Sequence, residues 1–113
     1  MLIYDMLSGF SAFIKHYYSE SIEIEVCSNK IDLHRFNVSD FNFCFFSIND
    51  IDDLLILIKM YTSKRHFFIR TSNDILYQKV SSPDYFKSDI FNYDCSKKSI
   101  LEKINFHLLQ ETV

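Results

Sequence analysis

The stretch from Phe43 to Asp50, Phe-Cys-Phe-Phe-Ser-Ile-Asn-Asp, constrains the fold of this chain most strongly. Four apolar residues run without a break and lead into a polar cluster. Such a run is typical of a strand that is buried on both faces of a parallel sheet. In open α/β sheets, ligand sites form beyond the carboxyl ends of the strands. Ser47, Asn49 and Asp50 are therefore expected at an edge of the sheet where a site can form.

Strand patterns and helix patterns alternate along the whole chain. Short apolar or alternating runs predict strands, and apolar residues spaced three and four apart predict helices. The predicted strands cover residues 1–5, 22–27, 41–47, 66–71 and 88–93, and the predicted helices cover residues 10–19, 31–38, 51–62, 75–81 and 97–110. The second strand alternates apolar and acidic residues, which favours a position at the edge of the sheet.

The predicted helices differ in how well their apolar faces are defined. The helix over residues 31–38 has only a ragged stripe. Three of the others are expected to bury regular stripes: Phe10, Phe13, Ile14 and Tyr17; Ile51, Leu54, Leu55, Ile58 and Met60; and Ile100, Leu101, Ile104, Leu108 and Leu109. Asp50, Asp52 and Asp53 begin one helix, where solvated acids favour the positive end of the helix dipole.

Five alternating strand–helix units predict a parallel sheet that is covered on both faces. The chain has 113 residues, which is one domain and too few for a classic dinucleotide-binding fold. The predicted fold is therefore an α/β flavodoxin-like three-layer sandwich, (βα)5, with a five-stranded sheet of order 2-1-3-4-5. In this order the first and third strands are neighbours, so Asp5 and Ser47 are expected to face one cleft.

Charge and composition exclude several functions. The net charge is −3 with a pI near 5.7, which argues against DNA binding by this segment alone. There is no basic segment before an apolar one at the N-terminus and no apolar run long enough to cross a membrane, so we expect a cytoplasmic protein. The three cysteines are expected to be small buried hydrophobes: Cys27, Cys44 and Cys95. The four histidines lack ligand spacing, so we expect no metal site: His16, His34, His66 and His107.

Four of the predicted strands end in short segments that contain polar residues. The ends are Asp5-Met6, Ser47-Ile48-Asn49-Asp50, Thr71-Ser72-Asn73-Asp74 and Tyr93-Asp94, the last with Phe91 two residues before Tyr93. In this order the chain resembles a response-regulator receiver domain in degenerate form, over nearly all of its length. Receivers end the first strand in two acids, the third in a phosphoacceptor aspartate, the fourth in Thr or Ser, and the fifth in Lys-Pro.

The departures from this pattern imply that the phosphoryl chemistry of receivers is lost. Met6 replaces the second acid, Ser47 replaces the phosphoacceptor, and Tyr93 replaces the lysine. Phosphoryl transfer needs a nucleophile, a metal ion and a cation. Ser47 lacks an activating base, and Asp5 alone is a poor magnesium site. We therefore expect a degenerate pocket with no catalytic residue and no cofactor, formed by Asp5, Met6, Ser47, Asn49, Thr71 and Tyr93.

Flavin binding is the alternative that this fold suggests. It would require a phosphate-binding loop rich in Ser, Thr and Gly after the first strand. Residues 5–9, Asp-Met-Leu-Ser-Gly, offer only two such residues beside an acid, so FMN is not expected.

The resemblance implies a regulatory domain of a bacterial transcription regulator that works without phosphorylation. Its expected partners are itself or another response regulator, with DNA bound only by a separate domain, and the 113 residues are expected to be an N-terminal domain of a longer regulator. The expected dimer or partner surface comprises Tyr77, Tyr85, Phe86, Phe91, Lys97, Lys98 and Lys103. The alternative is a stand-alone acidic adaptor that docks on a signalling or secretion partner, and an enzyme on the same fold is a third, weaker hypothesis.

Overall fold

The computed structural model describes residues 1–7, 9–18, 20–81, 86, 88–92 and 94–111. Its strands form one parallel sheet of order β2-β1-β3-β4-β5. The strands are β1 (Leu2–Tyr4), β2 (Glu25–Cys27), β3 (Phe43–Ile48), β4 (His66–Thr71) and β5 (Asp89–Asn92). The predicted flavodoxin-like order is therefore confirmed, with the acidic strand β2 at one edge.

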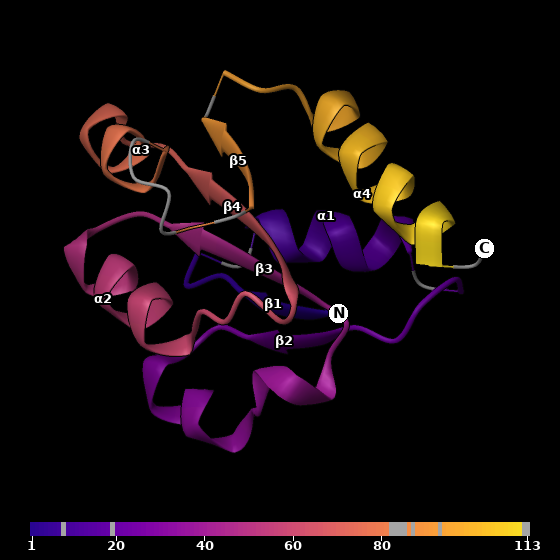
Figure 1. Ribbon diagram of the computed structural model, residues 1–113, viewed down its shortest axis with the longest axis horizontal. Helices are drawn as coiled ribbons and strands as arrows, with labels where there is room; N and C mark the ends of the chain where they lie inside the picture. The colour runs from indigo at the N-terminus through magenta and orange to yellow at the C-terminus, as the bar shows by residue number, and fades with distance from the viewer. Residues whose placement is uncertain (8, 19, 82–85, 87, 93, 112–113) are drawn as a thin grey trace.

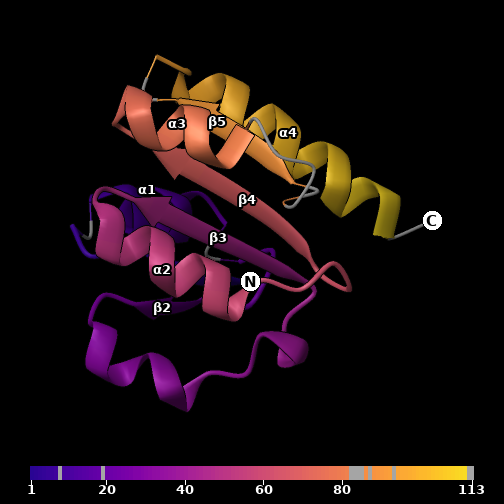
Figure 2. The same ribbon diagram turned by 60° about the vertical axis from the view of Figure 1, so that its left-hand side comes forward.

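The helices cover both faces of the sheet. They are α1 (Gly9–Tyr17), α2 (Ile51–Met60), α3 (Asp74–Ser81) and α4 (Lys97–Glu111). Figures 1 and 2 show α1 and α4 on one side of the sheet and α2 and α3 on the other. The pleat of β3 separates two cores, because successive side chains point to opposite faces. Phe43 and Phe45 pack with α1 and α4, whereas Cys44, Phe46 and Ile48 pack with α2 and α3.

The crossover between β2 and β3 differs from the prediction. Instead of a helix over residues 31–38, it holds two short 3-10 helices, η1 (Lys30–Arg35) and η2 (Val38–Asp40). The Asn37 side chain accepts a hydrogen bond from the Ser39 backbone N–H at 3.0 Å and so caps η2. A ragged apolar stripe buries too little surface to hold a full α-helix on the sheet, and among the described side chains of η1 only Leu33 is buried.

Helix α2 is rotated relative to the predicted stripe. Leu54 and Leu57 are buried, but three predicted core residues are exposed: Ile51 by 50%, Leu55 by 59% and Ile58 by 44%. Asp53, which we expected in solvent, is only 1% exposed. Its carboxylate accepts hydrogen bonds from the Tyr4 hydroxyl at 2.8 Å and the Asn49 N–H at 2.9 Å. These two bonds turn the Asp53 face of α2 toward the sheet, so the apolar ridge faces outward.

Two further stripe residues are exposed against expectation, namely Tyr17 on α1 and Leu109 on α4. Tyr18, which directly follows α1, is buried instead, and its hydroxyl donates to Asn105 Oδ1 of α4 at 2.6 Å. Cys27 and Cys44 are buried as predicted, whereas Cys95 is half-buried. Burial raises the pKa of the Cys27 thiol, and it raises the pKa of Cys44 to about 12. Within the described ranges, every helix is too short or too polar to cross a lipid bilayer.

Candidate functional site

A cleft of about 370 Å³ lies at the carboxyl edge of the sheet. It is lined by the loop after β1, the start of α1, the ends of β3 and β4, and the first residue of α4. The lining residues are Asp5, Leu7, Gly9, Phe10, Ser47, Asn49, Arg70 and Lys97. Asp5 and Ser47 therefore share one cleft, as predicted from the adjacency of the first and third strands.

The Asp5 carboxylate is engaged by the start of α1. One oxygen accepts the Ser11 N–H at 2.8 Å, and the other accepts the Leu7 N–H at 3.2 Å. The side chain is 1% exposed. A carboxylate at this place satisfies N–H groups that have no partner within the helix and complements the positive end of the helix dipole. Asp5 is therefore a helix cap, with both oxygens already used by the backbone.

Ser47 lies deep in the cleft and is 2% exposed. In the pairing of β3 with β4, Ser47 is level with Arg70, and Ile48 is level with Thr71. Side chains alternate between the two faces of a sheet, so this register puts Ser47 and Thr71 on opposite faces. The pleat thus separates two residues that the receiver pattern would bring together.

Thr71 has a local structural role. Its hydroxyl oxygen accepts the Asn73 N–H at 3.2 Å, and Asn73 Oδ1 in turn accepts the N–H groups of Ile75 and Leu76 at 2.8 and 3.2 Å. This chain of hydrogen bonds ends β4 and begins α3. Side-chain oxygens of Thr and Asn commonly stabilise turns and helix starts in this way.

The cleft contains two cations, and sequence reasoning did not place either of them there. Arg70 projects from β4, with its guanidinium carbon 4.9 Å from the centre of the Phe10 ring. Lys97 begins α4, and its ammonium lies 4.7 Å from the centre of the Phe13 ring. In the sequence, the feature that could have indicated the role of Arg70 is its charge within a largely apolar strand, His-Phe-Phe-Ile-Arg-Thr. A buried strand tolerates such a charge where its end reaches a polar cleft.

Two buried N–H groups in the lining have no hydrogen-bond partner among the described residues, Arg70 Nε and Asn49 Nδ2. Asn49 Oδ1 accepts the Ser72 hydroxyl at 3.4 Å, which directs the amide nitrogen elsewhere. Buried donors without a partner cost free energy and are seldom left so. Together with the charges of Arg70 and Lys97, they make the cleft a better binding site for an anion than for a metal ion.

Apart from Lys97, the other predicted site residues that the structure describes do not line this cleft. Met6 packs against the core on the α2 side. Tyr93 and Tyr85 lie outside the described residues. Phe86 and Phe91, which we expected on a partner surface, are buried at 9% and 5% exposure, so that prediction is wrong for them. Tyr77 is half-buried, and Lys97, Lys98 and Lys103 are exposed.

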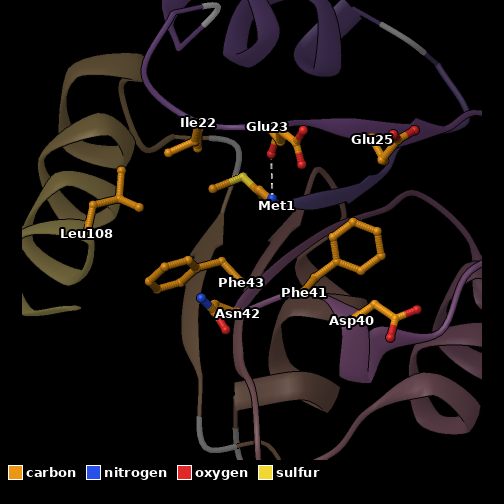
Figure 3. A pocket seen from close by; sticks show the side chains of 9 residues that line it. All are labelled: Met1, Ile22, Glu23, Glu25, Asp40, Phe41, Asn42, Phe43 and Leu108. Atoms are coloured by element: carbon orange, nitrogen blue, oxygen red, sulfur yellow. Dashed lines mark hydrogen bonds between the residues drawn. The ribbon is translucent and has the colours of Figure 1, made fainter. Parts of the chain in front are cut away.

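A second hollow of about 480 Å³ lies at the opposite edge of the sheet (Figure 3). Its lining comes from the starts of β1 and β3, the segment before β2, and α4. Glu23, Glu25 and Asp40 give it an acidic character, and the Met1 amine donates to the Glu23 carbonyl at 2.7 Å. Among the described lining residues there is no unpartnered buried polar group like those of the carboxyl-edge cleft. We therefore take the cleft around Ser47 as the candidate functional site.

Comparisons with protein-family models, with curated proteins and with solved structures found no match to this chain.

Proposed function

We propose that this chain is a non-catalytic, receiver-like regulatory domain of a cytoplasmic bacterial transcription regulator, which acts by binding and not by phosphoryl transfer. The observation that supports the proposal is which groups line the cleft and what they already bind. Ser47 lies near the end of the third strand in a sheet of order 2-1-3-4-5, and the Asp5 carboxylate in the same cleft accepts two backbone N–H groups.

The chemistry of the cleft supports binding over catalysis. Phosphoryl transfer to the protein requires a nucleophile, a metal ion on the phosphoryl oxygens, and a cation. Arg70 and Lys97 supply positive charge. A serine needs an adjacent base to act as a nucleophile, and no histidine lies among the described residues that line the cleft. The cleft keeps the charge that attracts an anion and lacks the groups that would react with it.

The first prediction concerns small phosphodonors. Incubation with acetyl phosphate and Mg²⁺ is expected to leave the intact mass of the protein unchanged, while a competent receiver treated in parallel gains a phosphoryl group. A Ser47→Asp variant should stay unmodified as well, because Asp5 remains engaged with α1 and no other acid stands among the described residues that line the cleft. A stable phosphoryl adduct on either protein would contradict the proposal.

Regulation without phosphorylation requires a protein partner. On α4, two large apolar side chains are exposed, Phe106 and Leu109, and Phe106 lines a groove between α4 and β5. Lys98 and Lys103 of α4 are also exposed and supply a charged rim. This side is the one we propose for self-association or for pairing with a second response regulator. The net charge of −3 leaves DNA binding to a separate domain.

The exposed ridge on α2 favours the second candidate function, a stand-alone adaptor. Ile51, Leu55 and Ile58 are spaced four and three residues apart, so they form one apolar stripe. Contiguous exposed apolar residues mark protein-binding surfaces more often than isolated ones do. Helix α2 lies on the opposite side of the sheet from α4, so the two functions use different surfaces.

A pair of variants distinguishes the two surfaces. If the chain is a dimerising regulator, light scattering should show a dimer that Phe106→Lys converts to monomer and Leu55→Lys leaves intact. Both side chains are more than half exposed, so neither change is expected to alter folding by more than about 0.5 kcal/mol. A wild-type chain that stays monomeric at high concentration would exclude the homodimer. Dissociation by Leu55→Lys alone would assign the interface to α2 instead.

A further inference from the structure

Three metal-ligating side chains meet at the amino edge of the sheet, opposite the cleft. They are His66, the first residue of β4, Asp89, the first residue of β5, and His107 in α4. The Nε2 atoms of both imidazoles point to the same carboxylate oxygen, Asp89 Oδ2, at 3.0 Å from His66 and 2.7 Å from His107. One ligand atom from each residue lies within 4.8 Å of the other two.

The fold brings these residues together from positions that are far apart in sequence. Strands β4 and β5 are parallel neighbours, so their first residues lie at the same edge of the sheet. Asp89 is level with Phe68, and His66 lies two residues before Phe68, so all three side chains are on one face. That face is the one that α4 covers, and Figure 3 shows Leu108 of α4 on the same side of the pocket as Phe43, the first residue of β3.

Aromatic rings hold the two imidazoles in place. The Phe68 ring lies edge-on to both, with centroid distances of 4.6 Å to His66 and 5.5 Å to His107. Phe43 lies 6.2 Å from His66 on another side. The three polar side chains are 23–27% exposed, so one side of the cluster is dry and the other is open to solvent. An apolar wall of this kind restricts ligand motion and lowers the local dielectric constant.

We propose that His66, Asp89 and His107 form a binding site for a divalent transition-metal ion of the Zn²⁺ class. Two imidazole nitrogens and one carboxylate oxygen are a ligand set that Zn²⁺ and neighbouring ions accept, whereas Mg²⁺ and Ca²⁺ prefer oxygen ligands alone. The set leaves coordination positions for water or an external ligand, as in sites that are not purely structural.

The spacing of the ligand atoms fits such an ion after small side-chain rotations. Tetrahedral Zn²⁺ with bonds of about 2.0–2.1 Å keeps its ligand atoms about 3.3 Å apart. The two observed nitrogen–oxygen distances of 3.0 and 2.7 Å need to open by only a few tenths of an ångström. The ring centroids are 3.8 Å apart, so the two imidazoles cannot both carry charge without strong repulsion. Neutral imidazoles beside an ionised carboxylate are the forms that bind metal.

The site also has an entry path. A groove of about 560 Å³ runs between β5 and α4, with Asp89 and Phe91 on one wall and Phe106 on the other. Of the three ligands, Asp89 lines this groove, so we infer that an ion enters from the side of its carboxylate. Once bound, it joins α4 to the starts of β4 and β5, which are otherwise connected there by two hydrogen bonds to one oxygen.

Titration of the untagged chain tests the site. After chelator treatment and removal of the chelator, ZnCl₂ measured by calorimetry is expected to bind with one equivalent, and MgCl₂ is expected to give no saturable heat. At a free Zn²⁺ concentration 100-fold above Kd, Tm should rise by about 10 °C. In the wild-type protein, imidazole NMR signals of His66 and His107 should shift on Zn²⁺ addition while those of His16 and His34 stay in place.

Matched variants identify the ligands. His107→Gln should weaken Zn²⁺ binding by more than about 100-fold, because a lost ligand costs more than a lost outer partner. His16→Gln, an exposed histidine on α1, should bind as wild type. Absence of stoichiometric binding, unshifted His66 and His107 signals, equal binding of Mg²⁺, or binding that survives His107→Gln but is lost in Cys95→Ser would each overturn the proposal. The NMR measurement needs no variant, so it decides the question even if His107→Gln fails to fold.

Discussion

Replacing Phe45 with alanine is expected to lower the free energy of unfolding by about 3–5 kcal/mol. Phe45 lies in the central strand and is 0% exposed. Its ring has three aromatic neighbours, Phe10 at 4.8 Å, Phe68 at 6.0 Å and Phe91 at 6.3 Å between centroids. Removing the ring deletes its transfer free energy and leaves a cavity between rigid rings that cannot all move into it. Such a loss is a large share of the about 5–15 kcal/mol that stabilises a typical domain.

Urea denaturation followed by circular dichroism measures this effect, and Leu55→Ala is the matched control. Leu55 is also apolar but is 59% exposed on α2, so its truncation should change the free energy of unfolding by less than about 0.5 kcal/mol. If the two variants lose similar amounts, then either Phe45 is not at the centre of the core or Leu55 is covered in solution. Light scattering on the same samples distinguishes these two explanations.

Replacing Asp53 with alanine is expected to cost about 2–4 kcal/mol. The carboxylate is 1% exposed and accepts the Tyr4 hydroxyl and the Asn49 N–H. Its own backbone N–H donates to Asp50 Oδ1 at 2.9 Å, so Asp53 joins the cap of α2 to the first strand. Alanine leaves the Tyr4 hydroxyl buried without its acceptor and frees the rotation of α2. The exposure of Ile51, Leu55 and Ile58 on α2 should change as the helix rotates.

Two companion variants separate the contributions to this effect. Asp52→Ala removes a carboxylate whose contact with Lys30 is exposed, at 3.4 Å, and should cost less than about 1 kcal/mol. Tyr4→Phe removes only the hydroxyl and should fall between the two. If Asp53→Ala costs no more than Asp52→Ala, the buried hydrogen bonds do not position α2.

The Tyr4–Asp53 pair also predicts a pH dependence. Burial, and after it the hydrogen bond to Asp53, raises the pKa of Tyr4 above its ordinary value of 10.0. A pKa raised by folding means that the neutral phenol contributes its full stability below pH 10 and loses it as the pH rises toward the folded-state pKa. Wild-type stability should therefore fall above pH 10 more steeply than that of Tyr4→Phe.

Part of the candidate site could be predicted from local patterns. Asp5 and Ser47 each end an apolar run, and the strand order places those runs side by side. The roles of the residues could not be predicted in this way. The Asp5 oxygens are used by α1, and Ser47 and Thr71 are separated by the one-residue register between β3 and β4. Register depends on contacts between distant segments, so a pattern along one strand carries no information about it.

Local sequence patterns also could not predict the cluster of His66, Asp89 and His107. The two hydrogen-bonded pairs, His66–Asp89 and Asp89–His107, are 23 and 18 positions apart, far outside any local ligand spacing. They meet because two parallel strands begin at one edge and α4 returns to it. A search for ligand motifs along the chain cannot find such a set, whereas the sheet order and the covering helix place it directly.

The amino-acid sequence by itself determined the alternation of strands and helices, the acidic edge strand and the polar strand ends, because these follow from side-chain periodicity within a few residues. The tertiary structure decided the rotation of α2, the loss of a full helix between β2 and β3, the burial of Phe86 and Phe91, and the placement of Arg70 in the cleft. Each of these depends on a contact between distant segments, such as the one from Tyr4 to Asp53. Such contacts form only when the whole sheet and its covering helices are assembled.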